Sequence, residues 1–193
     1  MALIDENIFL WINGLSGKVT FFDWLLTGIA NDYLIIVSSC LTLLLLWLWG
    51  SDIRRREKNQ KAVIGAAMSM GLADGFVALF NIFYFHPRPF TELPTNLLFY
   101  QPTDSSFPSN SAAVLFAIAC GVFLSNNKIG CALILLAFLH AFSRVYVGVH
   151  YPFDVLAGAA IGLVTALIAK GILKIINRWI NVALRLARRI YLA

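Results

Sequence analysis

Two arginines are the residues of this sequence best suited to bind an anion. Arg88 lies between two prolines that follow an apolar stretch, and Arg144 lies near the end of a later apolar stretch. A guanidinium donates hydrogen bonds in a planar fork that matches the oxygens of a phosphate group. Two such groups on separate segments therefore predict a site for a phosphate-bearing ligand.

A histidine and an aspartate follow Arg144 closely. His150 and Asp154 are four residues apart, and Pro152 between them suits the first turn of a helix. This spacing is compatible with Asp154 accepting a hydrogen bond from one imidazole nitrogen of His150. The other nitrogen would then be free to attack phosphorus, so the pair predicts a nucleophilic histidine.

Two further segments offer hydrogen-bond donors to the same ligand. Ser109, Asn110 and Ser111 open an apolar stretch, and the free backbone N–H groups and dipole of a helix start favour an anion. Ser143 adds a hydroxyl beside Arg144. A plainer interpretation stays open for each residue alone, because an arginine near a span end also serves as an anchor and a serine at a helix start also serves as a cap.

The composition excludes a water-soluble domain. Of the 193 residues, 60% are hydrophobic and 13% are charged, and the mean hydropathy is +0.78. Soluble domains are roughly 45–50% apolar and about 25% charged. The three cysteines, Cys40, Cys120 and Cys131, lie in apolar runs and indicate neither a disulfide framework nor a metal cluster. We expect no metal and no cofactor.

The hydropathy pattern predicts one all-α membrane bundle over residues 1–193, with about five to six transmembrane helices and amphipathic terminal helices. The predicted spans are 33–50, 62–85, 109–124, 129–146 and 153–173. The stretches 7–14 and 21–30 are too short to cross and are interpreted as interfacial or re-entrant helices. Residues 175–193 are predicted to form a basic amphipathic helix that lies on an anionic membrane surface.

The basic residues divide unequally between the two sides of this bundle. If the long side chains of Lys170 and Lys174 extend toward the nearer surface, five spans place twelve of the fifteen lysines and arginines on one side. These are Arg54, Arg55, Arg56, Lys58, Lys61, Lys128, Lys170, Lys174, Arg178, Arg185, Arg188 and Arg189. The positive-inside rule makes that side cytoplasmic. We therefore expect a multi-pass plasma-membrane protein with a cytoplasmic C-terminus and an extracytoplasmic site around Arg88 and Arg144. The net charge of +5 then indicates membrane lipids, not nucleic acid, as partners.

The motifs around these residues resemble a known family. Ser143-Arg144, five residues, His150, three residues and Asp154 resembles the third signature motif of the membrane-bound type 2 phosphatidic acid phosphatase superfamily. Arg88-Pro89 resembles the end of its first motif, and Pro108-Ser109 the start of its second. The resemblance covers residues 62–169, with the motifs within 81–154, and is strongest to the bacterial undecaprenyl-diphosphatase branch, the bacitracin-resistance type.

The resemblance implies a metal-independent lipid phosphatase, with undecaprenyl diphosphate as the expected substrate. His150 would form a phosphohistidine, and Asp154 would support it. The phosphate-binding residues implied or expected are Asn81, Arg88, Ser109, Asn110, Ser143 and Arg144. Phosphatidylglycerophosphate or phosphatidate is the alternative substrate, and the sequence does not determine the oligomeric state.

The sequence departs from the family pattern at two positions. Asn81 stands where the broad family has a lysine, and Ser111 stands where the second motif has a histidine, the general acid for the leaving oxygen. General acid catalysis contributes about 10²–10⁴-fold. Either activity is reduced or another group donates the proton, and His86 is the candidate. A protein that binds or translocates lipid phosphates without hydrolysing them is therefore a second alternative.

Asp74 is a carboxyl group inside the second predicted span. Intramembrane carboxyl groups commonly have a function. We expect Asp74 to be protonated and hydrogen-bonded to a neighbouring helix, too deep to touch the phosphate. The alternative is a proton or ion relay, as in a transporter.

Overall fold

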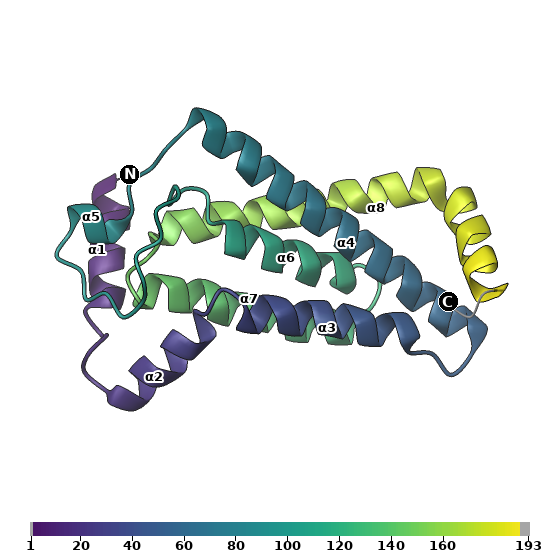
Figure 1. Ribbon diagram of the computed structural model, residues 1–193, viewed down its shortest axis with the longest axis horizontal. Helices are drawn as coiled ribbons and strands as arrows, with labels where there is room; N and C mark the ends of the chain where they lie inside the picture. The colour runs from purple at the N-terminus through teal and green to yellow at the C-terminus, as the bar shows by residue number, and fades with distance from the viewer. Residues whose placement is uncertain (1, 190–193) are drawn as a thin grey trace.

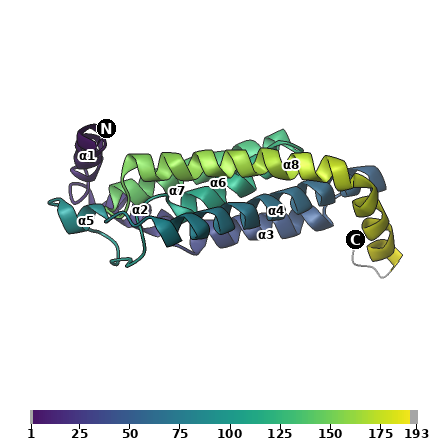
Figure 2. The same cartoon turned by 90° about the horizontal axis from the view of Figure 1, so that it is seen from above.

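The computed structural model describes residues 2–189, and these contain eight helices and no strand. They are α1 (Ala2–Asn13), α2 (Thr20–Ile29), α3 (Leu34–Leu48), α4 (Ile53–Phe83), α5 (Pro89–Glu92), α6 (Asn110–Phe123), α7 (Asn127–Tyr146) and α8 (Pro152–Arg189). The five long helices α3, α4, α6, α7 and α8 form an elongated bundle, and α1, α2 and α5 gather at one end of it (Figures 1 and 2). The prediction of an all-α membrane bundle is confirmed.

Helix α6 is the centre of the bundle. Every residue from Ala112 to Val122 is buried, because α4, α7 and α8 all pack against this helix. Small residues permit the close contact with α8. A Cβ atom at Gly158 would lie 2.4 Å from the Ser109 carbonyl oxygen, and one at Gly162 would lie 2.6 Å from the Ala117 nitrogen. Both glycines therefore let two helix backbones approach each other.

Fewer helices than predicted meet the length and composition expected of a full membrane span. Within the described residues, three do so alone: Ile53–Phe83, Asn127–Tyr146 and Pro152–Arg188. Helices α2 and α3 together would make a fourth, with a bend of 51° between them. Helix α6 is apolar but has 14 residues. The prediction counted α3 and α6 as separate full spans, whereas α3 continues a bent pair and the short α6 is covered by other helices.

The last span and the basic tail form one helix, whereas we expected a break near residue 174. Helix α8 turns away from the bundle axis toward its C-terminal end (Figure 1). Its Ile180 and Leu184 pack with Trp47 and Ile64, and Arg188 Nη2 lies 3.3 Å from Glu57 Oε2. This part of the tail is therefore attached to α3 and α4. Residues 190–193 of the predicted tail lie outside the described residues.

The two ends of the bundle differ in charge as the sequence predicted. We call the end that carries α1, α2 and α5 the α5 end, and the end with the α3–α4 and α6–α7 connections (residues 49–52 and 124–126) the C-terminal end. Asn59 Nδ2 donates to the Trp49 carbonyl at 2.8 Å, and residues 125–129 line one cavity with Arg55 and Lys58. The basic segments on α4 and at the start of α7 thus meet at the C-terminal end.

Candidate active site

His150 is buried in the connection between α7 and α8, at the α5 end. Its Nδ1 atom lies 2.9 Å from the carbonyl oxygen of Ser106, which can only accept a hydrogen bond. Nδ1 therefore carries the proton in this arrangement. Nε2 lies 3.3 Å from Nη1 of Arg88, and the imidazole lines a cavity. With the proton on Nδ1, Nε2 accepts from this guanidinium, and a ligand that takes over the Arg88 donor would free the Nε2 lone pair.

Ser106 links His150 to Asp154. Its hydroxyl donates to Asp154 Oδ2 at 2.5 Å, while its carbonyl accepts from His150. The direct distance between His150 Nδ1 and Asp154 Oδ2 is 3.7 Å, so the direct hydrogen bond expected from the i, i+4 spacing is replaced by this link. Ser106 was not among the predicted site residues, and its only signal in the sequence is its position two residues before Pro108, where the second motif starts.

Asp154 is held at the start of α8 by backbone groups. Oδ2 accepts from the backbone N–H of Tyr151 at 2.9 Å, and the Asp154 carbonyl accepts from the N–H of Ser109 at 3.0 Å. The second contact fixes the first turn of α6 against the first turn of α8. Asp154 therefore joins the second and third motifs as well as orienting the histidine through Ser106.

The imidazole of His150 is neutral at ordinary pH. Burial, together with the positive charges of Arg144 and Arg88, lowers the pKa of His150 to about 4, although Asp154 opposes this shift. A neutral imidazole has the lone pair that a nucleophile needs. The environment of His150 therefore suits attack on phosphorus.

Arg88 is buried and its donors are occupied. Nη1 donates to the Val149 carbonyl at 2.8 Å and to His150 Nε2 at 3.3 Å. Nη2 donates to Asp104 Oδ1 at 2.9 Å, and Nε donates to the Asp104 carbonyl at 3.1 Å. The Asp104 side chain is 67% exposed. An arriving phosphate could therefore replace this carboxylate on Arg88 without leaving a buried charge behind.

Arg144 is also buried and also paired with a carboxylate. Nη1 donates to Asp32 Oδ1 at 2.7 Å and to the Ala30 carbonyl at 3.0 Å, and the guanidinium lies 5.1 Å above the ring of Phe99. The hydroxyl of Tyr100 donates to the other oxygen of Asp32, and this hydrogen bond raises the pKa of Tyr100 to about 12. Asp32, Phe99 and Tyr100 were not predicted, because none of them lies in a recognisable motif.

A cavity of about 320 Å³ brings the predicted residues together. Its lining includes Arg88, Asn110, Ser111, Arg144 and His150, together with Asp32, Tyr100 and Asp104. Four segments distant in sequence therefore meet around one cavity at the α5 end. Two arginines and a nucleophilic nitrogen around one cavity can bind a phosphoryl group and attack it.

Several predicted residues do not line this cavity. The Ser143 hydroxyl donates to the His140 carbonyl of its own helix at 2.7 Å. Ser109 Oγ and Asn81 Oδ1 are buried without a hydrogen-bond partner in the described part of the chain. His86 lies among aromatic rings, with its centroid 5.5 Å from that of Tyr151. Its place outside the lining gives no support to His86 as a proton donor.

Ser111 lies in the first turn of α6, and Asp74 of α4 contacts the same turn. Ser111 lines the cavity, and its Oγ atom has no hydrogen-bond partner among residues 2–189. Asn110 Nδ2 donates to Asp74 Oδ1 on α4 at 3.0 Å. Asp74 thus accepts a hydrogen bond from the neighbouring helix α6. Because Asn110 itself lines the cavity, Asp74 is separated from the cavity by one side chain.

The described residues contain no group of three or more His, Cys, Asp or Glu side chains placed to hold a metal ion.

The fold and the site define a membrane-bound phosphatase. The chain matches the PAP2 superfamily over residues 62–178, and it belongs to that family. It is 34% identical to undecaprenyl-diphosphatase BcrC of Bacillus subtilis (strain 168) over 161 residues, which cover 83% of this chain and 80% of that protein.

Two crystal structures have the same fold. LpxE of Aquifex aeolicus superposes with a TM-score of 0.68 at 29% identity, over 86% of this chain and 93% of that one. The PAP2-type phosphatidylglycerolphosphate phosphatase of Bacillus subtilis gives a TM-score of 0.67 at 18% identity, over 91% and 87%. The second likeness concerns the fold alone. The family makes this chain a hydrolase of the membrane-bound phosphatase class.

Proposed function

We propose that this phosphatase removes the terminal phosphate of undecaprenyl diphosphate and releases undecaprenyl phosphate. The observation that carries the proposal is the single cavity that joins His150 Nε2 to Arg88 and Arg144. The name of the Bacillus subtilis relative BcrC supports the choice of substrate. A diphosphate also suits a site that presents two guanidinium groups.

The reaction proceeds in two displacements. Arg88 and Arg144 hold the terminal phosphate after it replaces Asp104 and Asp32 on their guanidinium groups. His150 Nε2 forms a bond to phosphorus while the bridging P–O bond breaks, and the lipid leaves as its monophosphate. The oxygen of a water molecule then bonds to phosphorus while the bond between phosphorus and Nε2 breaks. One water proton passes to the released phosphate or to solvent, and His150 returns to its neutral form.

The serine at position 111 affects the leaving group. Serine is a poor proton donor near neutral pH, but a phosphate monoester leaves with less protonation than an alkoxide. A diphosphate substrate therefore depends less on a general acid than a phosphate monoester such as phosphatidate. The unpartnered Ser111 hydroxyl in the cavity also supports a second candidate function, in which the chain binds lipid phosphates and hydrolyses them slowly or not at all.

Release of inorganic phosphate from a panel of lipids tests the proposal. Purified full-length chain is expected to release phosphate from undecaprenyl diphosphate faster than from phosphatidylglycerophosphate or phosphatidate. Faster release from either phospholipid would assign the substrate to that class. Binding of all three lipids without release would favour the second candidate function.

We also propose that the α5 end faces the extracytoplasmic side of the plasma membrane. The support is the charge division, since the basic segments of α4 and α7 meet at the opposite end. A cysteine at Thr103 is expected to react with an impermeant thiol reagent outside intact cells, and one at Arg54 is not. Reversed labelling would place the site in the cytoplasm.

A further inference from the structure

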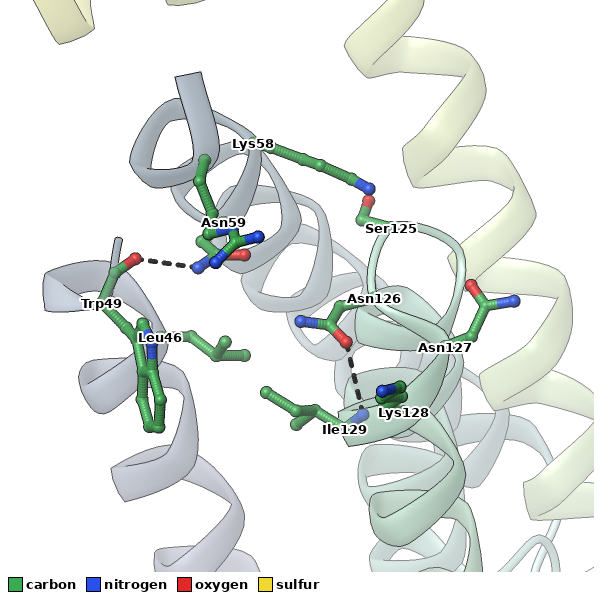
Figure 3. A pocket seen from close by; sticks show the side chains of 10 residues that line it. Leu46, Trp49, Lys58, Asn59, Ser125, Asn126, Asn127, Lys128 and Ile129 are labelled. Carbon is green, nitrogen blue, oxygen red and sulfur yellow. Dashed lines mark hydrogen bonds between the residues drawn. The ribbon is translucent and has the colours of Figure 1, made fainter. Parts of the chain in front are cut away.

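A second cavity, of about 580 Å³, lies at the C-terminal end of the bundle, opposite to the active site. The first turns of α4 supply Arg55, Lys58 and Asn59, and the α6–α7 connection with the first turn of α7 supplies Ser125 to Ile129. Leu46 and Trp49 of the α3 end complete the lining (Figure 3). The cavity thus has one polar wall from α4, a second from the α6–α7 connection and the start of α7, and an apolar side from α3.

Three cations line this cavity, and no carboxylate does. They are Arg55, Lys58 and Lys128. None of the ion pairs found among residues 2–189 involves them, whereas Lys61 and Arg188 at the same end both pair with Glu57, at 3.1 and 3.3 Å. All three side chains are exposed. Their positive charge is therefore available to an anion from outside the chain.

Neutral donors surround the same space. Asn126 Oδ1 accepts from the backbone N–H of Ile129 at 3.4 Å, which leaves the Asn126 NH₂ group free to donate toward a ligand. The side chain of Asn127 and the hydroxyl of Ser125 also line the cavity. Amide and hydroxyl donors beside several cations match the oxygens of a phosphate group.

The neighbouring surface of α3 is apolar. Leu45, Leu48 and Trp49 are 61%, 59% and 62% exposed. Tryptophan is favoured at the level of lipid head groups, and leucines below it contact acyl chains. The cavity therefore combines a phosphate-binding wall with a surface for hydrocarbon, and basic pockets of this kind between membrane helices bind anionic lipid head groups.

We propose that this cavity binds the phosphate-bearing head group of an anionic phospholipid, as a site separate from the active site. Arg55, Lys58 and Lys128 would contact the phosphate, and the acyl chains would lie along α3. A free phosphate ion would share the first set of contacts but not the second. The lipid therefore has to bind more tightly than the inorganic ion.

Native mass spectrometry of the purified full-length chain tests the site, with phosphatidylglycerol and phosphatidylcholine as probes. Each cation near an anionic lipid contributes roughly fivefold in affinity. The variant Arg55→Gln/Lys58→Gln/Lys128→Gln is expected to lose at least about tenfold in affinity for phosphatidylglycerol. The matched variant Lys174→Gln/Arg178→Gln/Arg185→Gln removes the same charge from the α8 tail, outside the cavity, and is expected to lose clearly less affinity than the cavity variant.

Equal losses in both triple variants, or no loss in the first, would overturn the proposal. The single variant Lys128→Gln, at an exposed position on the first turn of α7, provides the same comparison if the triple variant does not fold, with an expected loss of roughly fivefold. Wild-type affinity in that variant would also contradict the site. Inorganic phosphate that displaces the lipid at equal concentration would assign the cavity to the free ion instead.

Discussion

Arg144 donates to Asp32 over 2.7 Å, so a carboxylate from the α2–α3 connection holds the guanidinium that we propose for the substrate phosphate. Asp32 and the phosphate therefore compete for one cation. Asp32→Asn is expected to lower KM about fivefold, as removal of a partly exposed competing ion pair would. Steady-state kinetics checks this, with Tyr100→Phe as the control that keeps the carboxylate. A raised KM in a folded Asp32→Asn variant would mean that Asp32 assists binding.

Ser106 is predicted to position His150 for attack. Ser106→Ala removes the hydroxyl that bonds Asp154 and is expected to lower kcat about tenfold with little change in KM, because orientation of the nucleophile matters in the transition state. Ser143→Ala is the matched control, since both serines are fully buried and the Ser143 hydroxyl bonds its own helix. Equal effects of the two variants would contradict the positioning role.

The protonation of His150 is predicted to occur far below the ordinary pKa of about 6.5. Its pKa is lowered to about 4, so the neutral nucleophile persists into moderately acidic solution. Folding stability contributed by the neutral ring is lost as pH falls from about 6.5 toward that lowered value. Nuclear magnetic resonance of isotope-labelled imidazole nitrogens checks the titration, with His86→Gln and His140→Gln used for assignment. A His150 midpoint near 6.5 would contradict the environment described above.

Ser111→His is predicted to raise kcat by about 10²-fold, because an imidazole at this cavity position could protonate the leaving oxygen. Substrate affinity should change little, since proton donation acts in the transition state. His86→Ala is expected to have a small effect, because His86 does not line the cavity. A severe loss in His86→Ala with no gain in Ser111→His would instead assign the proton donor to His86.

The sequence predicted the convergence of Arg88, Arg144 and His150 because motif spacing fixes which residues stand at helix ends. The sequence did not predict that Asp104 pairs with Arg88 or that Asp32 pairs with Arg144. Asp32 lies in a four-residue connection between α2 and α3, and no periodicity determines where such a connection passes. Asp104 lies in the long segment between α5 and α6, and its contact with Arg88 could not be predicted for the same reason.

Ser143 illustrates a second limit of sequence reasoning. It is adjacent to Arg144 in sequence, yet consecutive helical residues point about 100° apart at 3.6 residues per turn. The Ser143 hydroxyl therefore turns back to the His140 carbonyl while Arg144 reaches the cavity. Continuity of α8 past residue 174 was also missed, because an amphipathic pattern beyond an apolar one does not reveal whether the helix breaks between them.

Trapping of a phosphorylated enzyme is the most direct test of the proposed mechanism. Wild-type chain quenched during turnover with undecaprenyl diphosphate that is radiolabelled in its terminal phosphate is expected to carry an acid-labile, alkali-stable phosphohistidine. His150→Ala is expected to carry no label and to release no phosphate, while keeping the thermal stability of a folded bundle. Turnover or labelling that persists in folded His150→Ala would contradict the assignment of His150 as the nucleophile.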